Sequence, residues 1–200
     1  MKYPGWVVWI TGLPGSGKSV VAHALQRILA DRKVESQILS SDELRTVMTP
    51  RPRYTKEERD AVYETLAFIA RLLSKNHVNV IIDSTGNLRK YRSACRRRVE
   101  RFAEVYLDCP LETCISREQK RRVRFNAPTR IYEKARTGKS KTVPGVGAPY
   151  QKPLSPEVTV DTSRLSPAES ASRIVADLAE FLFSRAPETK RRKPSLCESY

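Results

Sequence analysis

Hydrophobic residues gather in five short runs along the chain, and longer amphipathic stretches separate these runs. Each run is rich in β-branched or aromatic residues and too short for a helix, so each predicts a strand. The predicted strands are 6–10, 34–39, 78–82, 102–107 and 158–160. Strands that alternate with helices predict an α/β fold with a parallel five-stranded sheet flanked by helices. The ligand site of such a sheet lies at the carboxyl ends of its strands.

Apolar positions between the strands recur at helical spacing, as at Val62, Leu66, Ile69 and Leu73. The helix from Thr55 has a start signal, because Thr55 followed by Glu58 matches a capping box. The predicted helices cover 20–29, the stretch from Thr55 to Leu73, 88–101, a segment opened by 109–112, and 167–183.

The length of 200 residues and the 40% share of hydrophobic residues suit one domain, which we place at 1–185. Residues 186–200 are polar and basic, and we expect them to form a disordered tail. No apolar run approaches the length needed to span a membrane, and the N-terminus lacks a signal-peptide pattern. The four cysteines form no C-x-x-C pair. We therefore expect a cytoplasmic protein with free thiols and no membrane partner.

The net charge of +15 is concentrated in basic runs at 96–98, 120–122 and 190–193. Such charge could attract a polyanion, but runs of this kind are more often a solvated helix face, a phosphate-binding lid and a tail. We do not expect nucleic acid to be the main partner.

The first predicted strand ends in a glycine-rich loop that carries the strongest chemical signal in the chain. Its residues are Gly12, Leu13, Pro14, Gly15, Ser16, Gly17, Lys18 and Ser19, the P-loop signature between a strand and a helix. Backbone N–H groups of such a loop surround phosphate oxygens at a helix N-terminus. Lys18 can reach the β- and γ-phosphates of ATP, and the Ser19 hydroxyl can ligate Mg²⁺. The loop predicts a P-loop nucleoside triphosphate hydrolase or kinase fold.

Other polar segments follow the remaining strands. The second strand ends in a polar turn, 40–45, which contains Asp42. The third ends at Asp83, the Walker B arrangement for Mg²⁺, although Asp83 could instead cap the next helix. A basic segment after the fourth strand resembles a lid, with Arg117, Arg121 and Arg122 as candidates to neutralise phosphoryl charge. The Gly/Pro-rich segment 137–156 is either a substrate loop or disordered.

These motifs together resemble the adenylylsulfate kinase (APS kinase) family. The P-loop is similar to the family's GLSGSGKS loop, and SSDELR at 40–45 is similar to a DGDNVR turn. The segment IYEKARTGKSKTVPGVGAPYQKPLSPEVTVDT at 131–162 matches a long family pattern. The resemblance implies ATP-dependent phosphorylation of the 3′-hydroxyl of adenosine 5′-phosphosulfate (APS). Dimers are common among such proteins, so a homodimer is a candidate assembly.

The resemblance also suggests roles for individual residues. Asp42 would accept the proton of the sugar hydroxyl, a role that needs a carboxylate within hydrogen-bond reach. Arg45 and Arg59 would grip the phosphosulfate, Lys141 would close over it, and Tyr54 would stack on the adenine of APS. Arg117, Arg121 and Thr162 would contact the nucleotide.

The chain departs from the family pattern on the acceptor side. Val62 replaces a family asparagine, the acids of the family's DDPYE stretch are absent from 147–151, and the lid carries extra residues at about 119–129. The family's FISP stretch aligns with 84–87, so Gly86 stands at its serine, a reported phosphorylation position, and Ser84 does not inherit that role.

These departures leave two alternatives open. The first is a P-loop kinase for another hydroxyl, since 83–87 also looks like the Asp-x-Thr-x-Asn turn of polynucleotide 5′-hydroxyl and small-molecule kinases. The second is a nucleic-acid-binding module switched by ATP, supported by the basic surplus. The presence of Lys18, Asp42 and Asp83 speaks against the second, because a binding module need not keep both a candidate base and a metal-linked carboxylate.

Overall fold

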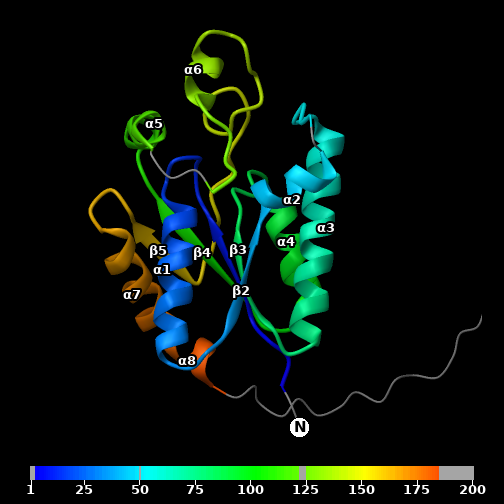
Figure 1. Ribbon diagram of the computed structural model, residues 1–200, viewed down its shortest axis with the longest axis vertical. Coiled ribbons are helices and arrows are strands. Elements are labelled where there is room, and N and C mark those ends of the chain that lie inside the picture. The colour runs from blue at the N-terminus through cyan, green and yellow to red at the C-terminus, as the bar shows by residue number, and fades with distance from the viewer. Residues whose placement is uncertain (1–2, 50, 122–124, 185–200) are drawn as a thin grey trace, which may run out of the picture.

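A parallel five-stranded sheet forms the centre of the protein in the computed structural model, which describes residues 3–49, 51–121 and 125–184 (Figure 1). The strand order is β2-β3-β1-β4-β5. The strands are β1 (Val7–Thr11), β2 (Ser36–Ser40), β3 (Asn79–Asp83), β4 (Phe102–Asp108) and β5 (Val158–Asp161). The predicted fold is confirmed, and each strand lies within one or two residues of its predicted position.

The central strand β1 is buried at every position. It pairs with β3 on one side, Val7 opposite Val80, and with β4 on the other, Val7 opposite Phe102. The chain fills one half of the sheet with β2 and β3 before it crosses to β4. The strand order therefore changes direction at the carboxyl end of β1, the position where open α/β sheets bind their ligands.

Helices cover both faces of the sheet (Figure 1). Val8 and Ile10 of β1 belong to one apolar cluster with residues of α1 and α7, whereas Val7 and Trp9 belong to a second cluster with residues of α3. Successive side chains of a strand point to opposite faces, so β1 anchors both layers. The helices are α1 (Lys18–Asp31), α2 (Ser41–Met48), α3 (Lys56–Lys75), α4 (Arg89–Arg98), α5 (Leu111–Lys120), α6 (Ile131–Arg136), α7 (Pro167–Asp177) and α8 (Ala179–Phe183).

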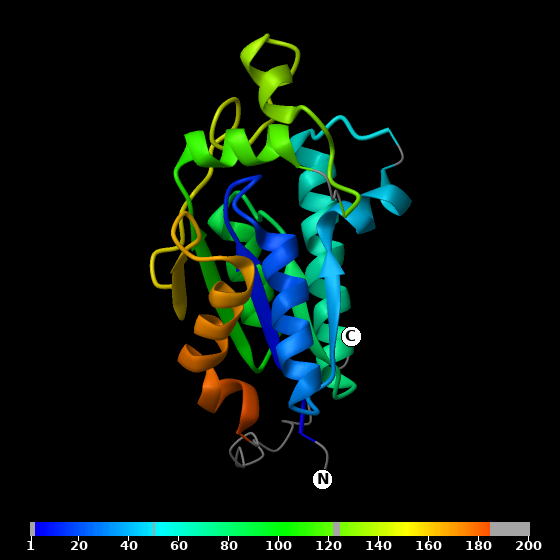
Figure 2. The same ribbon diagram turned by 60° about the vertical axis from the view of Figure 1, so that its left-hand side comes forward.

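A smaller structure lies above the carboxyl ends of the strands. Helices α5 and α6 cross this end of the molecule in Figure 2. Cys109, Cys114 of α5, Tyr132 of α6 and Val143 form a third apolar cluster, which joins the two helices. The Tyr132 hydroxyl donates to the Pro14 carbonyl at 2.7 Å. The predicted lid region is thus attached directly to the P-loop.

The structure corrects the predicted turn at 40–45. Ser40 is an N-cap whose hydroxyl accepts the backbone N–H groups of Asp42 and Glu43, and helix α2 begins at Ser41. A polar stretch that begins with Ser and continues with acidic residues stabilises a helix start as well as it does a turn. Asp42 therefore lies in the first turn of a helix.

Helix ends account for the other differences. The Thr55 hydroxyl accepts the Glu58 N–H as predicted, but the Glu58 carboxylate accepts the N–H groups of Arg53 and Tyr54, so only half of the capping box forms. The predicted helix 88–101 ends at Arg98. The predicted helix 167–183 is two helices, since α7 ends at Asp177 and α8 begins at Ala179.

Two other predictions concern residues 137–156 and the C-terminal tail. Residues 137–156 contain a single isolated β-bridge, between Pro144 and Ala148, and they border the cavity described below. The predicted tail at 186–200 lies outside the described residues. No helix in the described ranges is long and apolar enough to cross a membrane.

Candidate active site

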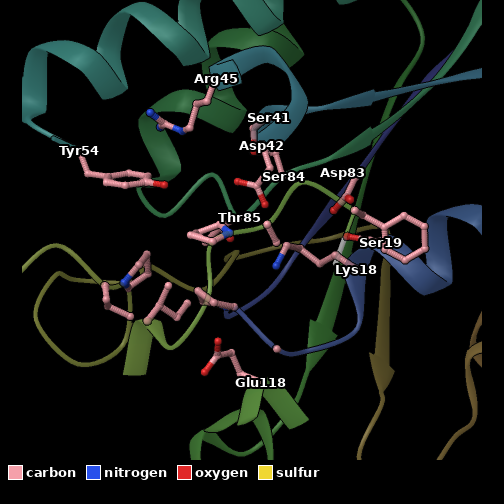
Figure 3. A pocket seen from close by; sticks show the side chains of 18 of the residues that line it. Lys18, Ser19, Ser41, Asp42, Arg45, Tyr54, Asp83, Ser84, Thr85 and Glu118 are labelled. Carbon is pink, nitrogen blue, oxygen red and sulfur yellow. The ribbon is translucent and has the colours of Figure 1, made fainter. Parts of the chain in front are cut away.

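A cavity of about 510 Å³ opens at the carboxyl edge of the sheet. The P-loop, α2, α3, the turn after β3, α5, the lid segment that follows it, and residues 140–144 contribute to its lining. In Figure 3, the labelled side chains of Lys18, Asp42, Ser84 and Thr85 lie close together, while Tyr54 and Arg45 lie at the opposite end. The volume is in the range of small-molecule sites.

Long-range contacts hold the P-loop in place. Gly15 has a φ of +84°, and a Cβ there would collide with the Cys114 carbonyl of α5, so the loop needs glycine at this position. The Thr162 hydroxyl, 3% exposed, donates to the Ser16 carbonyl at 2.9 Å. Thr162, a predicted nucleotide contact, therefore supports the loop from behind and does not line the cavity. Pro14, Gly15, Gly17, Lys18 and Ser19 do line it.

Lys18, Asp42 and Asp83 form the charged centre of the site. Burial raises the pKa of the Asp42 carboxyl, and the neighbouring Asp83 raises it further, whereas Lys18 and Arg45 oppose the shift. Burial lowers the pKa of Lys18, and Asp83 and Asp42 partly offset this effect. The Lys18 ammonium donates to the Leu13 carbonyl at 3.1 Å. An aspartate with a raised pKa binds a proton more readily than an ordinary carboxylate, which suits a general base.

Ser19 and Asp83 have the chemistry and the position of Mg²⁺ ligands. Both line the cavity beside Lys18, and both supply the oxygen ligands that Mg²⁺ prefers. Helix α4 begins at Arg89 after Leu88 and has no side-chain cap, so Asp83 does not cap it. Within the described ranges, no cluster of three or more His, Cys, Asp or Glu side chains could hold a metal ion. The residues fit an Mg²⁺ ion that arrives with a nucleotide and completes its coordination with phosphate oxygens and water.

Arg45 dominates the opposite end of the cavity. The residue is 6% exposed, and its Nη1 atom has no acceptor among the described residues. Its guanidinium lies over the Tyr54 ring, with Cζ 4.9 Å from the ring centroid. A buried guanidinium with a free donor beside an aromatic ring is suited to an aromatic anion.

Arg59 has a different environment from Arg45. Its Nε, Nη1 and Nη2 atoms donate to the Tyr54 carbonyl at 3.1 Å, Asn87 Oδ1 at 3.3 Å and the Thr142 carbonyl at 2.5 Å. Every nitrogen of this side chain is thus already engaged with protein. Lys141 is exposed and does not line the cavity, although Ser140 and Thr142 on either side of it do.

The lid contributes Arg117, Arg121 and a residue that sequence reasoning missed. Both arginines line the cavity, but Arg117 Nη2 donates to the Thr162 carbonyl at 2.6 Å and Arg121 Nη2 to the Pro128 carbonyl at 3.0 Å. The missed residue is Glu118, which is 6% exposed and lines the cavity, with Oε1 3.9 Å from Arg121 Nη2. Arg122 lies outside the described residues.

Other lining residues also escaped prediction. Ser84 and Thr85 follow β3 directly, and their position after a strand end was an available signal. Phe125 stacks on His23 of α1 with ring centroids 4.7 Å apart, a contact that depends on tertiary structure.

Two of the positions that depart from the family pattern, Val62 and Gly86, do not line the cavity. Val62 is fully buried in α3, and Gly86 is buried with a φ of +47°. A Cβ at Gly86 would lie 2.8 Å from Trp9 Cζ2 and 2.9 Å from Arg92 Cγ.

Comparisons with known proteins agree on one family. The family model for adenylylsulphate kinase matches residues 4–161. An adenylyl-sulfate kinase of Rippkaea orientalis is 33% identical over 187 residues, covering 94% of this chain and 98% of its relative. One of Halothermothrix orenii is 33% identical over 184 residues, covering 92% and 95%. A Mycobacterium tuberculosis APS kinase, solved with AMPPNP and APS, is 28% identical with a TM-score of 0.78, covering 88% of this chain and 99% of that one. This chain therefore belongs to the adenylylsulphate kinase family.

Proposed function

We propose that the protein transfers the γ-phosphate of ATP to the 3′-hydroxyl of adenosine 5′-phosphosulfate. The observation that carries this proposal is a single cavity with a P-loop lysine and two carboxylates at one end and a buried, aromatic-stacked arginine at the other. Such a cavity can hold a triphosphate and an anionic, aromatic acceptor side by side. The family and the APS bound to the related M. tuberculosis enzyme support this choice of substrate.

The donor end is built to bind phosphate. Backbone N–H groups of the P-loop and the Lys18 ammonium hold the phosphates, and Arg117 and Arg121 face the same space from α5 and its end. Mg·ATP supplies the phosphoryl group, and the metal neutralises part of its charge. Ser19 and Asp83 would hold the metal ion.

Asp42 would take the proton from the acceptor hydroxyl. A sugar hydroxyl is a weak acid, so an aligned carboxylate helps by accepting its proton as the bond to phosphorus forms. The raised pKa of Asp42 makes it a stronger proton acceptor than an exposed aspartate. Lys18 lies close enough to interact electrostatically with this carboxylate, so the phosphate-binding lysine and the candidate base belong to one cluster.

Arg45 would bind the phosphosulfate, and Tyr54 would stack on the adenine. The free Nη1 donor of Arg45 needs an acceptor, and an anionic oxygen is the best one. Arg59 assists by holding the Tyr54 carbonyl and the cavity wall at Thr142. Lys141 would have to rotate inward on binding, since it is exposed without ligand.

The proposal extends to the location, domain organisation and assembly of the protein. We propose a cytoplasmic kinase with one catalytic domain at 1–185 that forms a homodimer. A hexameric APS kinase of Thiobacillus denitrificans illustrates that related chains form oligomers.

The direct test is steady-state kinetics with Mg·ATP and APS, with the product identified by mass spectrometry. A kcat/KM of about 10⁴ M⁻¹s⁻¹ or more would establish the activity. The control is Lys18→Ala, which should abolish turnover by removing phosphate neutralisation while the fold remains intact by circular dichroism. Absence of turnover with APS in the wild-type protein would refute the proposal.

A second candidate function is phosphorylation of a different hydroxyl acceptor. It is favoured by the departures from the family pattern on the acceptor side and by the turn 83–87, which resembles the Asp-x-Thr-x-Asn turn of kinases for other hydroxyls. Sugars, nucleosides and 5′-hydroxyl oligonucleotides assayed in parallel with APS would discriminate the two functions. Turnover of one of these acceptors in place of APS would establish the alternative.

A further inference from the structure

The cavity wall at 140–151, which we call the acceptor loop, is attached to the body of the protein by the apolar packing of Val143 and by polar contacts near its two ends. The loop lines the cavity through Ser140, Thr142, Val143 and Pro144. Its internal bonds include Ala148 N–H to the Val143 carbonyl at 2.9 Å and Gly145 N–H to the Ala148 carbonyl at 2.9 Å. Those bonds shape the bend of the loop, but they do not fix where it lies relative to the sheet.

Asn87, in the turn between β3 and α4, bonds to the end of the loop that is nearest β5 in sequence. Arg92 Nη2 also donates to this end, at the Gln151 carbonyl, at 2.7 Å. Its Nδ2 atom donates to the Pro149 carbonyl at 3.0 Å, and its backbone carbonyl accepts the Gln151 N–H at 2.8 Å. The residue is 3% exposed, so neither bond competes with bulk water. A buried amide that lost its acceptor would carry the cost of an unsatisfied donor.

The same side chain connects to the other end of the loop. Asn87 Oδ1 accepts from Arg59 Nη1 at 3.3 Å, and Arg59 Nη2 donates to the Thr142 carbonyl at 2.5 Å. A continuous chain of hydrogen bonds therefore runs from Thr142 through Arg59 and Asn87 to Pro149. It joins both ends of the acceptor loop to the turn that follows Asp83, Ser84 and Thr85.

We infer that Asn87 is a positioning residue that sets the acceptor loop at its working distance from the reaction centre. It must donate and accept at once, and among residues of its size only an amide does both in fixed directions. It does not line the cavity, so it touches no substrate directly.

The role of Asn87 has a specific kinetic consequence, which rests on the proposed function. The hydrogen bonds of Asn87 lead to the acceptor loop and to Arg59, whereas the P-loop receives its own hydrogen bonds from Tyr132 and Thr162. Loosening the loop should therefore weaken acceptor binding and leave ATP binding unchanged. Loss of one hydrogen bond corresponds to a rise of about three- to tenfold in the KM for the acceptor.

The test variant is Asn87→Asp, which keeps the size and the acceptor for Arg59 but cannot donate to Pro149. Asn79→Asp is the matched control. Asn79 Nδ2 donates to the Glu35 carbonyl at 2.9 Å and Oδ1 accepts the Trp6 N–H at 3.2 Å, the same two-sided bridge at the opposite end of β3. Both variants lose one amide donor, but only Asn87 touches the acceptor loop.

Two kinds of measurement are needed. Steady-state kinetics give the KM values for APS and for ATP, and amide hydrogen exchange in peptides that cover 142–151 reports on the loop. For Asn87→Asp we expect the KM for APS to rise about three- to tenfold, the KM for ATP to stay within twofold, and loop exchange to accelerate. Asn79→Asp should change neither KM and leave loop exchange as in wild type.

The inference is overturned if Asn87→Asp leaves loop exchange unchanged, or if it raises both KM values equally. It is also overturned if Asn79→Asp produces the same pattern. Hydrogen exchange needs no acceptor, so it judges the loop attachment even if wild-type protein fails to phosphorylate APS. That failure would refute the proposed function alone.

Discussion

The buried ion pair between Arg92 of α4 and Glu104 of β4 allows a quantitative prediction. Arg92 Nε donates to Glu104 Oε1 at 2.5 Å, and the two side chains are 1% and 11% exposed. Arg92 also donates to the carbonyls of Gly86 and Gln151. Replacing Arg92 with Met fills similar volume but leaves a buried carboxylate and two carbonyls without their donor.

The expected loss of unfolding free energy is at the lower end of the range for a broken buried pair. Such losses are about 3–5 kcal/mol. Arg96 Nη2 lies 3.8 Å from Glu104 Oε2 and is partly exposed, so it can offset part of the unpaired charge. A loss of about 3 kcal/mol in a domain of this size lowers Tm by roughly 6–12 °C.

Thermal and urea denaturation of three variants would check this value. Arg92→Met should show the full loss, and the double variant Arg92→Met with Glu104→Leu should recover most of it, because removing both charges removes the desolvation cost. Arg173→Met is the control. Arg173 pairs with Asp177 at 2.7 Å, but it is 62% exposed, so its loss should be under about 1 kcal/mol. The reasoning would be refuted if the unfolding free energy of Arg92→Met lay within about 1 kcal/mol of the wild-type value. It would also be refuted if the double variant were no more stable than Arg92→Met.

Four further predictions concern the active site and its surroundings. Asp42→Asn should lower kcat about 10²- to 10⁴-fold and leave the KM for ATP unchanged. In the wild-type protein, kcat should fall as pH drops through the raised pKa of Asp42. An unchanged kcat in the variant would show that Asp42 is not the base. The same variant should have a higher Tm than wild type at neutral pH. The native state binds the Asp42 proton more tightly than the unfolded chain, so stability falls as pH rises from 3.8 through the native pKa, and Asn abolishes that loss. Arg45→Met should raise the KM for APS at least tenfold, by loss of a charged hydrogen bond, and leave the KM for ATP unchanged, whereas Arg45→Lys should recover part of the binding. Gly86→Ser should cost about 2–4 kcal/mol in urea denaturation, because serine adds left-handed strain and overpacks Trp9 and Arg92.

Most of the fold could be predicted from local patterns along the chain. The strand before Gly12 and the helix after Ser19 gave the P-loop its context, and buried strands between amphipathic helices gave the parallel sheet. The nearness of Lys18, Asp42 and Asp83 could be expected because all three follow strand ends of one parallel sheet. These features depend on contacts between neighbours in sequence or on topology alone.

Features that depend on side chains distant in sequence could not be predicted. Whether Thr162 faces a nucleotide or the back of the P-loop depends on how β5 is placed beside β4, and the structure turns its hydroxyl to Ser16. In the sequence, Arg59 and Arg45 look equally suited to bind an anion. In the structure, however, Arg59 donates hydrogen bonds to Thr142 and Asn87, which lie 83 and 28 residues away. The helix start at Ser41 was missed because capping serines and turn serines look alike in sequence.

The packing around Gly86 also limits the order in which this chain could have changed. Trp9 and Arg92 occupy the space that a side chain at position 86 would need, and Arg92 is held by Glu104. A serine at position 86 would therefore cost less stability if a smaller residue first replaced one of these neighbours. The order in which substitutions are made at these positions thus decides how stable each intermediate sequence would be.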